Sequence, residues 1–177
     1  IQLSYNNDDQ ISRLQTASGK HWHYGYTHHQ KLAQINRPNA SQENQVYDRH
    51  GNLTKYTDAN GVVWQLKYGA FDLLIEKIDG EGHVWRYDYD KDSLKLSKVI
   101  NPKGEQYTYA FNADGQVEVE TDFAGNLWHY TYDANGALNT LTDGEGHQTQ
   151  YTYNANGQLI QLTTVDDVIS YTYDNAG

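Results

Sequence analysis

Four histidines near the start of the chain come closest, by type and spacing, to a metal site. His21 and His23 flank Trp22, and His28 and His29 follow shortly after. Side chains two positions apart on a strand share one face, so His21 and His23 could hold one ion between them. A protein zinc site needs three or four converging groups, however. We therefore interpret these histidines as solvated polar positions, and we expect no bound metal and no cofactor.

Acidic residues recur at regular intervals, which raises the question of calcium, as in other β-repeat proteins. Each recurrent Asp or Asn opens a four-residue segment that ends in Gly, as in Asp133-Ala134-Asn135-Gly136. Asp and Asn are the preferred first residues of a type I turn. Turn formation therefore explains these carboxylates without a calcium ion.

The composition also argues against catalysis, nucleic-acid binding and membrane insertion. The chain of 177 residues has no Cys, and no Ser or Asp departs from the repeat pattern as a nucleophile would. Its 13 basic and 23 acidic residues give a net charge of 13 − 23 = −10, without a basic run. No apolar stretch approaches the roughly 18 residues that a membrane helix needs. We expect no catalytic residue, no nucleic-acid partner and no membrane span.

A repeat of roughly 21 residues organises the whole chain. One aromatic residue per unit defines its phase, and successive copies lie 20 to 22 positions apart. Most of the 16 Tyr and all 4 Trp fall in three positions of this unit, at the anchor and two and four residues before it. A spacing of two puts the three rings on one face of a strand. The predicted aromatic ladder comprises Trp22, Trp64, Trp85, Tyr107 and Trp128; Tyr24, Tyr87, Tyr109, Tyr130 and Tyr151; and Tyr26, Tyr47, Tyr68, Tyr89, Tyr132 and Tyr153.

Turns separate the strands every 10 or 11 residues. Gly suits the fourth position of these turns because it adopts positive φ at little cost. The last of the predicted turns runs from Asp174 to Gly177. The glycines assigned a structural role in the other turns are Gly51, Gly61, Gly82, Gly104, Gly115, Gly125, Gly136, Gly146 and Gly157.

The strand after most anchors carries an apolar residue six positions later and in several copies another three positions further on, such as Leu138 and Leu141. This three-residue step breaks simple alternation, so we expect either a bulge or a local twist. Two short strands per unit joined by tight turns predict an all-β, curled antiparallel meander of tandem hairpins. We expect a single array over residues 1–177, of about eight repeats, that is an internal segment of a longer protein. Its open sheet edges should pair with other repeats.

The segment Gly125-Asn126-Leu127-Trp128-His129-Tyr130-Thr131-Tyr132-Asp133-Ala134-Asn135-Gly136-Ala137-Leu138 resembles the YD repeat of the Rhs family, and the resemblance covers essentially the whole chain. That family includes bacterial polymorphic toxins, the C components of insecticidal toxin complexes and the teneurins. The resemblance implies a spiral β-shell that encloses a C-terminal toxin. It also implies secretion, delivery by a bacterial secretion system or display at the cell surface.

The alternative function is an aromatic-repeat module that binds cell-wall carbohydrate or choline. Aromatic faces suit sugars and quaternary amines. Choline-binding repeats, however, resemble Gly-x-Trp-Tyr-Tyr, where neighbouring rings alternate across the strand. The Trp-x-Tyr-x-Tyr spacing seen here favours a continuous ladder, and therefore the shell wall.

Overall fold

The computed structural model describes residues 1–174 and consists almost entirely of β-strands. The predicted turn over Asp174 to Gly177 extends beyond these described residues. The strands are β1 (Gln2–Tyr5), β2 (Ile11–Gln15), β3 (His21–Tyr26), β4 (Leu32–Asn36), β5 (Gln42–Tyr47), β6 (Leu53–Thr57), β7 (Val63–Tyr68), β8 (Leu74–Ile78), β9 (Val84–Tyr89), β10 (Leu96–Ile100), β11 (Gln106–Phe111), β12 (Val117–Thr121), β13 (Leu127–Tyr132), β14 (Leu138–Thr142), β15 (Gln148–Tyr153), β16 (Leu159–Thr163) and β17 (Val168–Ser170).

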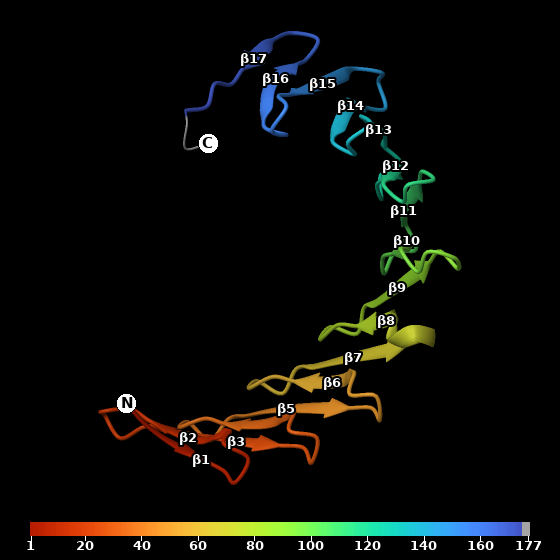
Figure 1. The fold of residues 1–177 in the computed structure, drawn as a ribbon. Helices are drawn as coiled ribbons and strands as arrows, with labels where there is room; N and C mark the ends of the chain where they lie inside the picture. The colour runs from red at the N-terminus through yellow and green to blue at the C-terminus, as the bar shows by residue number, and fades with distance from the viewer. Residues whose placement is uncertain (175–177) are drawn as a thin grey trace. The chain divides into compact units, whose positions relative to one another are not determined.

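The 17 strands form one open sheet in which each strand pairs antiparallel with the next along the chain (Figure 1). The prediction of an all-β meander of tandem hairpins is confirmed. A single 3₁₀ turn, η1 (Ala70–Asp72), replaces the usual turn between β7 and β8. In the part of the chain that the structure describes, no helix is long and apolar enough to cross a membrane.

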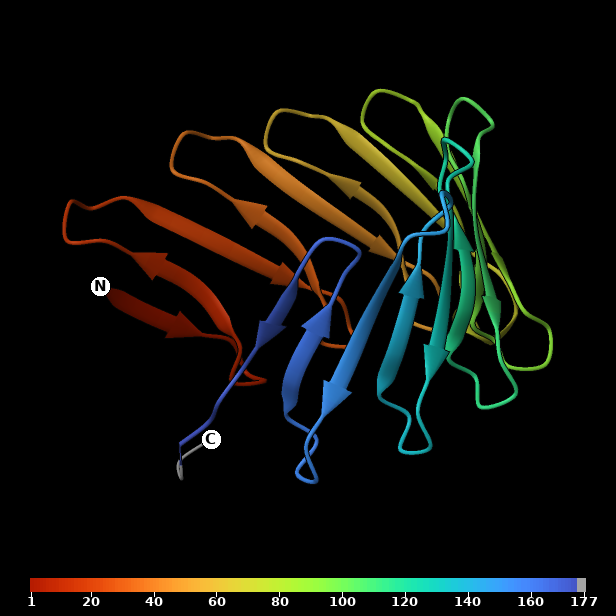
Figure 2. The same ribbon diagram turned by 90° about the horizontal axis from the view of Figure 1, so that it is seen from above.

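Two compact units divide the chain, Ile1–Arg86 and Tyr87–Gly177. Within each unit, consecutive strands run in opposite directions and are joined by turns (Figure 2). Strands of about six residues that carry the aromatic rings alternate with strands of about five residues. No hydrophobic side chain of the described residues is fully buried, and the one buried polar residue is Glu43, which is 8% exposed. Each unit is therefore a single layer whose apolar face is half-buried rather than a domain built around a dry core.

A β-bulge resolves the three-residue step between apolar positions. Thr131 pairs with Thr140, but the next residue, Tyr132, pairs with Leu138, so Asn139 is the extra residue. Two residues of β14 therefore oppose one residue of β13, which returns Leu138 and Leu141 to the same face. Of the two possibilities that the sequence left open, the bulge is the one observed. Equivalent register shifts occur in the pairs β1–β2, β3–β4, β5–β6, β7–β8, β11–β12 and β15–β16.

Candidate functional site

The aromatic face is half-buried along each ring-bearing strand. In β13 the side chains of Trp128, Tyr130 and Tyr132 are partly buried, whereas His129 and Thr131 between them are exposed. In unit 1 the rings of Tyr56 and Trp64 stack across neighbouring strands, with their centroids 5.3 Å apart. Offset stacking of this kind stabilises half-exposed aromatic surface. A ladder that runs through all the predicted positions stays a prediction.

Several anchor tyrosines join their repeat to the one before it. The hydroxyl of Tyr132 donates to the backbone carbonyl of Val117 at 2.7 Å, 15 residues earlier and at the start of a bulged strand. A phenol thus satisfies a carbonyl and buries its ring at the same time. The same bond joins Tyr26 to Ile11, Tyr47 to Leu32, Tyr68 to Leu53 and Tyr173 to Leu159, at 2.7 to 3.0 Å.

Glu43 places a carboxylate on the aromatic face of unit 1, in the position that Trp occupies in other repeats. Both Nε and Nη2 of Arg37 donate to its Oε1, and the Tyr56 hydroxyl donates to its Oε2 at 3.3 Å. Burial raises the pKa of Tyr56, and the charge of Glu43 raises it further. The ion pair explains how a carboxylate is tolerated at the most buried site of the described residues.

Glu120 occupies the aromatic face of unit 2, at the position that Leu14, Leu141 and Leu162 occupy in three other repeats. Tyr107 donates its hydroxyl to Glu120 Oε1 at 2.9 Å, and the Tyr107 ring lies 5.0 Å from Tyr109 and 5.5 Å from Phe123. Burial, followed by the hydrogen bond to Glu120, raises the pKa of Tyr107 to about 12. The same two causes raise the pKa of Tyr130. The cluster is a set of protonated phenols around one carboxylate.

The turns are built by their first residue. Asp48 Oδ1 accepts the backbone N–H groups of His50 and Asn52, both at 2.9 Å, and the Gly51 N–H donates to the Asp48 carbonyl at 3.1 Å. The bond from the Asn52 N–H is the main cause that lowers the pKa of Asp48. All nine glycines assigned to the turns have φ between +77° and +87°. Asp9, Gln30 and Ala40 adopt a similar left-handed conformation in turns that lack Gly.

Neighbouring turns are also joined directly. Gln10 Nε2 donates to the Gln30 carbonyl at 2.8 Å, and Lys31 Nζ donates to the Gly51 carbonyl at 2.6 Å, each 20 residues further along the chain. In unit 2, Lys95 donates to the Gly115 carbonyl, and Gln116 donates to the Gly136 carbonyl at 2.8 Å. In these four places a polar side chain just before a strand therefore links its own turn to the next turn on the same side of the sheet.

The histidines do not assemble as one group. The rings of His21 and His23 are 6.4 Å apart, and an Arg13 guanidinium nitrogen lies 3.1 Å from His21 Nδ1. The rings of His28 and His29 pack at 3.6 Å in the following turn. A guanidinium beside His21 opposes a second cation at that position.

The turn over residues 143–147 brings three possible metal ligands together. The ligand atoms of Asp143, Glu145 and His147 lie within 4.8 Å of one another. His147 Nδ1 is 3.1 Å from Asp143 Oδ2, while Asp143 Oδ1 accepts two backbone N–H groups of its own turn. Three ligands on an exposed turn are one fewer than a closed zinc site uses. The expectation of no metal and no calcium stays a prediction.

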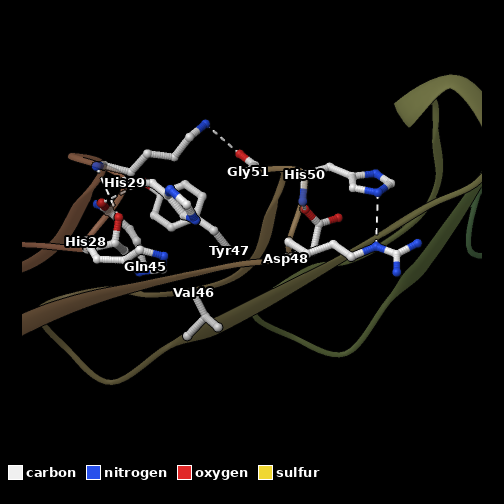
Figure 3. A pocket seen from close by; sticks show the side chains of 11 residues that line it. His28, His29, Gln45, Val46, Tyr47, Asp48, His50 and Gly51 are labelled. Atoms are coloured by element: carbon white, nitrogen blue, oxygen red, sulfur yellow. Dashed lines mark hydrogen bonds between the residues drawn. The ribbon is translucent and has the colours of Figure 1, made fainter.

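A hollow between two turns of unit 1 that lie on the same side of the sheet is a cavity that the sequence did not indicate. It has a volume of about 720 Å³ and lies between the turns at residues 27–31 and 48–51, with residues 45–47 of β5 as a third side (Figure 3). His50 Nδ1 lies 2.9 Å from Asp72 Oδ1, and Arg49 Nε donates to His50 Nε2 at 3.0 Å. Sequence reasoning considered His28 and His29 only as metal ligands and gave no signal for His50.

The family model described as RHS Repeat matches residues 47–84, 111–148 and 132–169, which together make up more than half of the chain. The chain belongs to the RHS-repeat family. Two relatives from Dickeya dadantii (strain 3937), "Probable deoxyribonuclease RhsA" and "Probable deoxyribonuclease RhsB", are each 39% identical over 130 residues. The alignments cover 72% of this RHS-repeat chain but 9% of either relative, so the chain spans about a tenth of their length.

Solved structures share the fold of this RHS-repeat chain. The "Crystal Structure of TcdB2-TccC3" aligns with a TM-score of 0.60 and 19% identity, over 99% of this chain and 13% of that one. The "Crystal Structure of TcdB2-TccC3-Cdc42" aligns with a TM-score of 0.58 and 19% identity, over 99% and 12%. At this identity the likeness extends to the fold alone.

Proposed function

We propose that this chain forms part of the wall of an Rhs-type β-shell that encloses a C-terminal toxin for delivery to other cells. The observation that carries the proposal is that RHS repeats build one open antiparallel sheet by repetition of a single hairpin. Sheets of more than about ten strands rarely stay flat and open, so we propose that a longer array curls into a spiral.

A wall of this kind extends when further strands pair with its edges, and it does not need a larger hydrophobic core. The sheet is open, and its unpaired backbone groups suit the addition of further repeats from the same longer protein. The partners that we propose are therefore other repeats at the sheet edges and an enclosed toxin domain. Delivery by a bacterial secretion system, in competition between bacteria, follows from the same proposal.

The proposed wall has no catalytic part. Two relatives carry the name probable deoxyribonuclease, but this chain aligns with only 9% of each. We assign any toxin activity to a separate part of the longer protein, and we assign shape and mechanical continuity to the repeats.

The test is protease access to the region downstream of the repeats in the intact protein. Val119→Pro places proline in β12, where Val119 pairs with Ala110 on one side and with His129 on the other. Proline removes a ladder hydrogen bond in the middle of a sheet and should open the wall there. Ala134→Pro is the matched control, because Ala134 is the second residue of a turn, and the turn Asn101-Pro102-Lys103-Gly104 already carries proline there.

We expect the downstream region to resist protease in the wild type and in Ala134→Pro, and to be cleaved rapidly in Val119→Pro. Equal cleavage of that region in all three proteins would contradict enclosure. If choline or a cell-wall polysaccharide binds the intact protein and the downstream region is freely cleaved, the binding-module function replaces the shell.

A further inference from the structure

The hollow between the turns at residues 27–31 and 48–51 has the volume of a small-molecule site and is open to solvent. Its volume of about 720 Å³ falls within the roughly 300 to 1,000 Å³ typical of ligand pockets. The hydrogen bond from Lys31 Nζ to the Gly51 carbonyl, which we call the Lys31 clasp, joins the two turns that form its walls (Figure 3). Because this bond fixes the distance between the turns, the hollow is built into the folded repeat.

The one carboxylate that lines this hollow, Asp48, is already engaged, as is the Gly51 carbonyl. Asp48 Oδ1 accepts the N–H groups of His50 and Asn52, and Asp48 Oδ2 accepts from the Asn52 side chain at 3.2 Å. The Gly51 carbonyl accepts from Lys31. The Asp48 carboxylate therefore stabilises its own turn and does not offer its oxygens to a ligand.

The donors, in contrast, are in surplus. His50 Nε2 accepts from Arg49 Nε, so a neutral His50 must carry its proton on Nδ1, which faces Asp72 Oδ1. This chain of contacts orients Arg49, while its two Nη nitrogens make no hydrogen bond to any of residues 1–174. His28 and His29 likewise make no side-chain hydrogen bond within the described range. A hollow with spare N–H groups and engaged acceptors is suited to an anion.

One end of the hollow offers ring surfaces. Tyr47, His28 and His29 gather at one end of the hollow, and His50 lies at the other (Figure 3). The imidazole rings of His28 and His29 pack at 3.6 Å, and the Lys31 ammonium lies 5.4 Å from the centre of the Tyr47 ring. Rings with N–H donors suit a flat heterocycle whose edge accepts hydrogen bonds.

We propose that this hollow binds a nucleoside monophosphate, with the base at the Tyr47, His28 and His29 end and the phosphate on the Arg49 guanidinium. A guanidinium matches the oxygen geometry of phosphate. The purine ring nitrogens accept from the imidazoles. This function is additional to the wall and does not depend on enclosure of a toxin.

The test measures binding of adenosine 5′-monophosphate (AMP) to the intact protein by titration calorimetry, beside adenosine, inorganic phosphate and glucose 6-phosphate. We expect AMP to bind at least about tenfold more tightly than either half alone and than glucose 6-phosphate, since a charge-assisted hydrogen bond contributes about that factor. Arg49→Gln should weaken AMP binding about tenfold or more without moving the melting midpoint. Lys103→Gln, which makes the same charge change in an exposed turn of unit 2, should bind AMP as the wild type does.

A double variant, His28→Gln with His29→Gln, tests the ring end separately and should lower AMP affinity while leaving phosphate affinity unchanged. The proposal is overturned if AMP binds no more tightly than phosphate or glucose 6-phosphate. It is also overturned if Arg49→Gln and the double variant bind AMP as the wild type does. A loss of AMP binding equal in Lys103→Gln and Arg49→Gln would likewise overturn it, because net charge alone would then be responsible.

Discussion

Removal of a single anchor hydroxyl tests whether Tyr, rather than any aromatic residue, is required at this position of the repeat. Tyr132→Phe keeps the ring and deletes only the oxygen that donates to the Val117 carbonyl at 2.7 Å. A neutral hydrogen bond contributes about 0.5 to 1.5 kcal/mol net. For a chain of this length a loss of about 1 kcal/mol lowers the melting midpoint by roughly 2 to 4 °C. Differential scanning calorimetry resolves a shift of that size.

Two matched variants in unit 2 separate the hydroxyl from the ring. Tyr151→Phe deletes a hydroxyl for which the described residues show no hydrogen-bond partner, so we expect a much smaller shift in the melting midpoint. Phe111 occupies an anchor position without a hydroxyl, and the residue 15 positions before it, Leu96, begins β10 as Val117 begins β12. Phe111→Tyr should therefore gain the missing bond and raise the midpoint. Equal shifts for Tyr132→Phe and Tyr151→Phe, together with no gain from Phe111→Tyr, would refute the role of the hydroxyl.

Three further predictions concern unit 2. The pKa of Tyr107 is about 12 in the folded state, against 10.0 for a free phenol. The stabilisation linked to its proton is therefore complete below pH 10 and is lost as the pH rises toward 12. Alkaline unfolding followed by circular dichroism should show a smaller loss of stability in Glu120→Gln than in the wild type. The hydrogen bond from Asn126 Nδ2 to Asp122 Oδ2 is the main cause that lowers the pKa of Asp122 below 3.8, so this contribution is present above that pH and is lost on acidification. Asp122→Asn keeps Oδ1, which accepts the two turn N–H groups, and removes the charge together with Oδ2, so it should flatten the acid limb of the stability curve. Gly125 has φ of +86°, and no atom lies within 4 Å of a Cβ added there. Gly125→Ala should therefore lower the free energy of unfolding in urea by about 1 to 2 kcal/mol through backbone strain alone. An unchanged unfolding midpoint would show that the turn relaxes.

The fold was predictable because its two local rules repeat in phase. The Trp128, Tyr130 and Tyr132 spacing fixes one strand face, and the Asp-x-x-Gly segments fix where each strand ends. Even the insertion near Lys91 is absorbed locally: Leu94 takes a left-handed conformation with φ of +57°, and the longer turn leaves the following strand in phase. Local sequence patterns of this kind predict the structure because each hairpin contacts only its neighbours.

The bonds between repeats were not predictable from the same rules. The step from Tyr132 to Val117 spans 15 residues, and its direction depends on the bulge that the sequence left open. The hollow beside Arg49 depends on the Lys31 clasp, which joins atoms 20 residues apart. Contacts between two turns depend on the twist and stagger of the strands, which periodicity alone does not specify.

These bonds between repeats explain how a sheet without a dry core holds its shape. An anchor residue such as Tyr132 half-buries its ring and satisfies a carbonyl of the preceding repeat, and a bond such as that from Lys31 to Gly51 ties two turns on the same side of the sheet. Both interactions are confined to neighbouring repeats, so every added hairpin brings its own stabilisation and none depends on a distant centre. A globular domain stops growing when its single hydrophobic core reaches its maximum size. A strip of repeats that are joined only to their neighbours has no such limit on its length. A shell wall requires that property. Its continuity then depends on successive repeats staying in phase. A deletion such as the one between Tyr153 and Tyr173 is then tolerated because the Tyr173 hydroxyl still reaches Leu159, one residue nearer in sequence, at 2.7 Å.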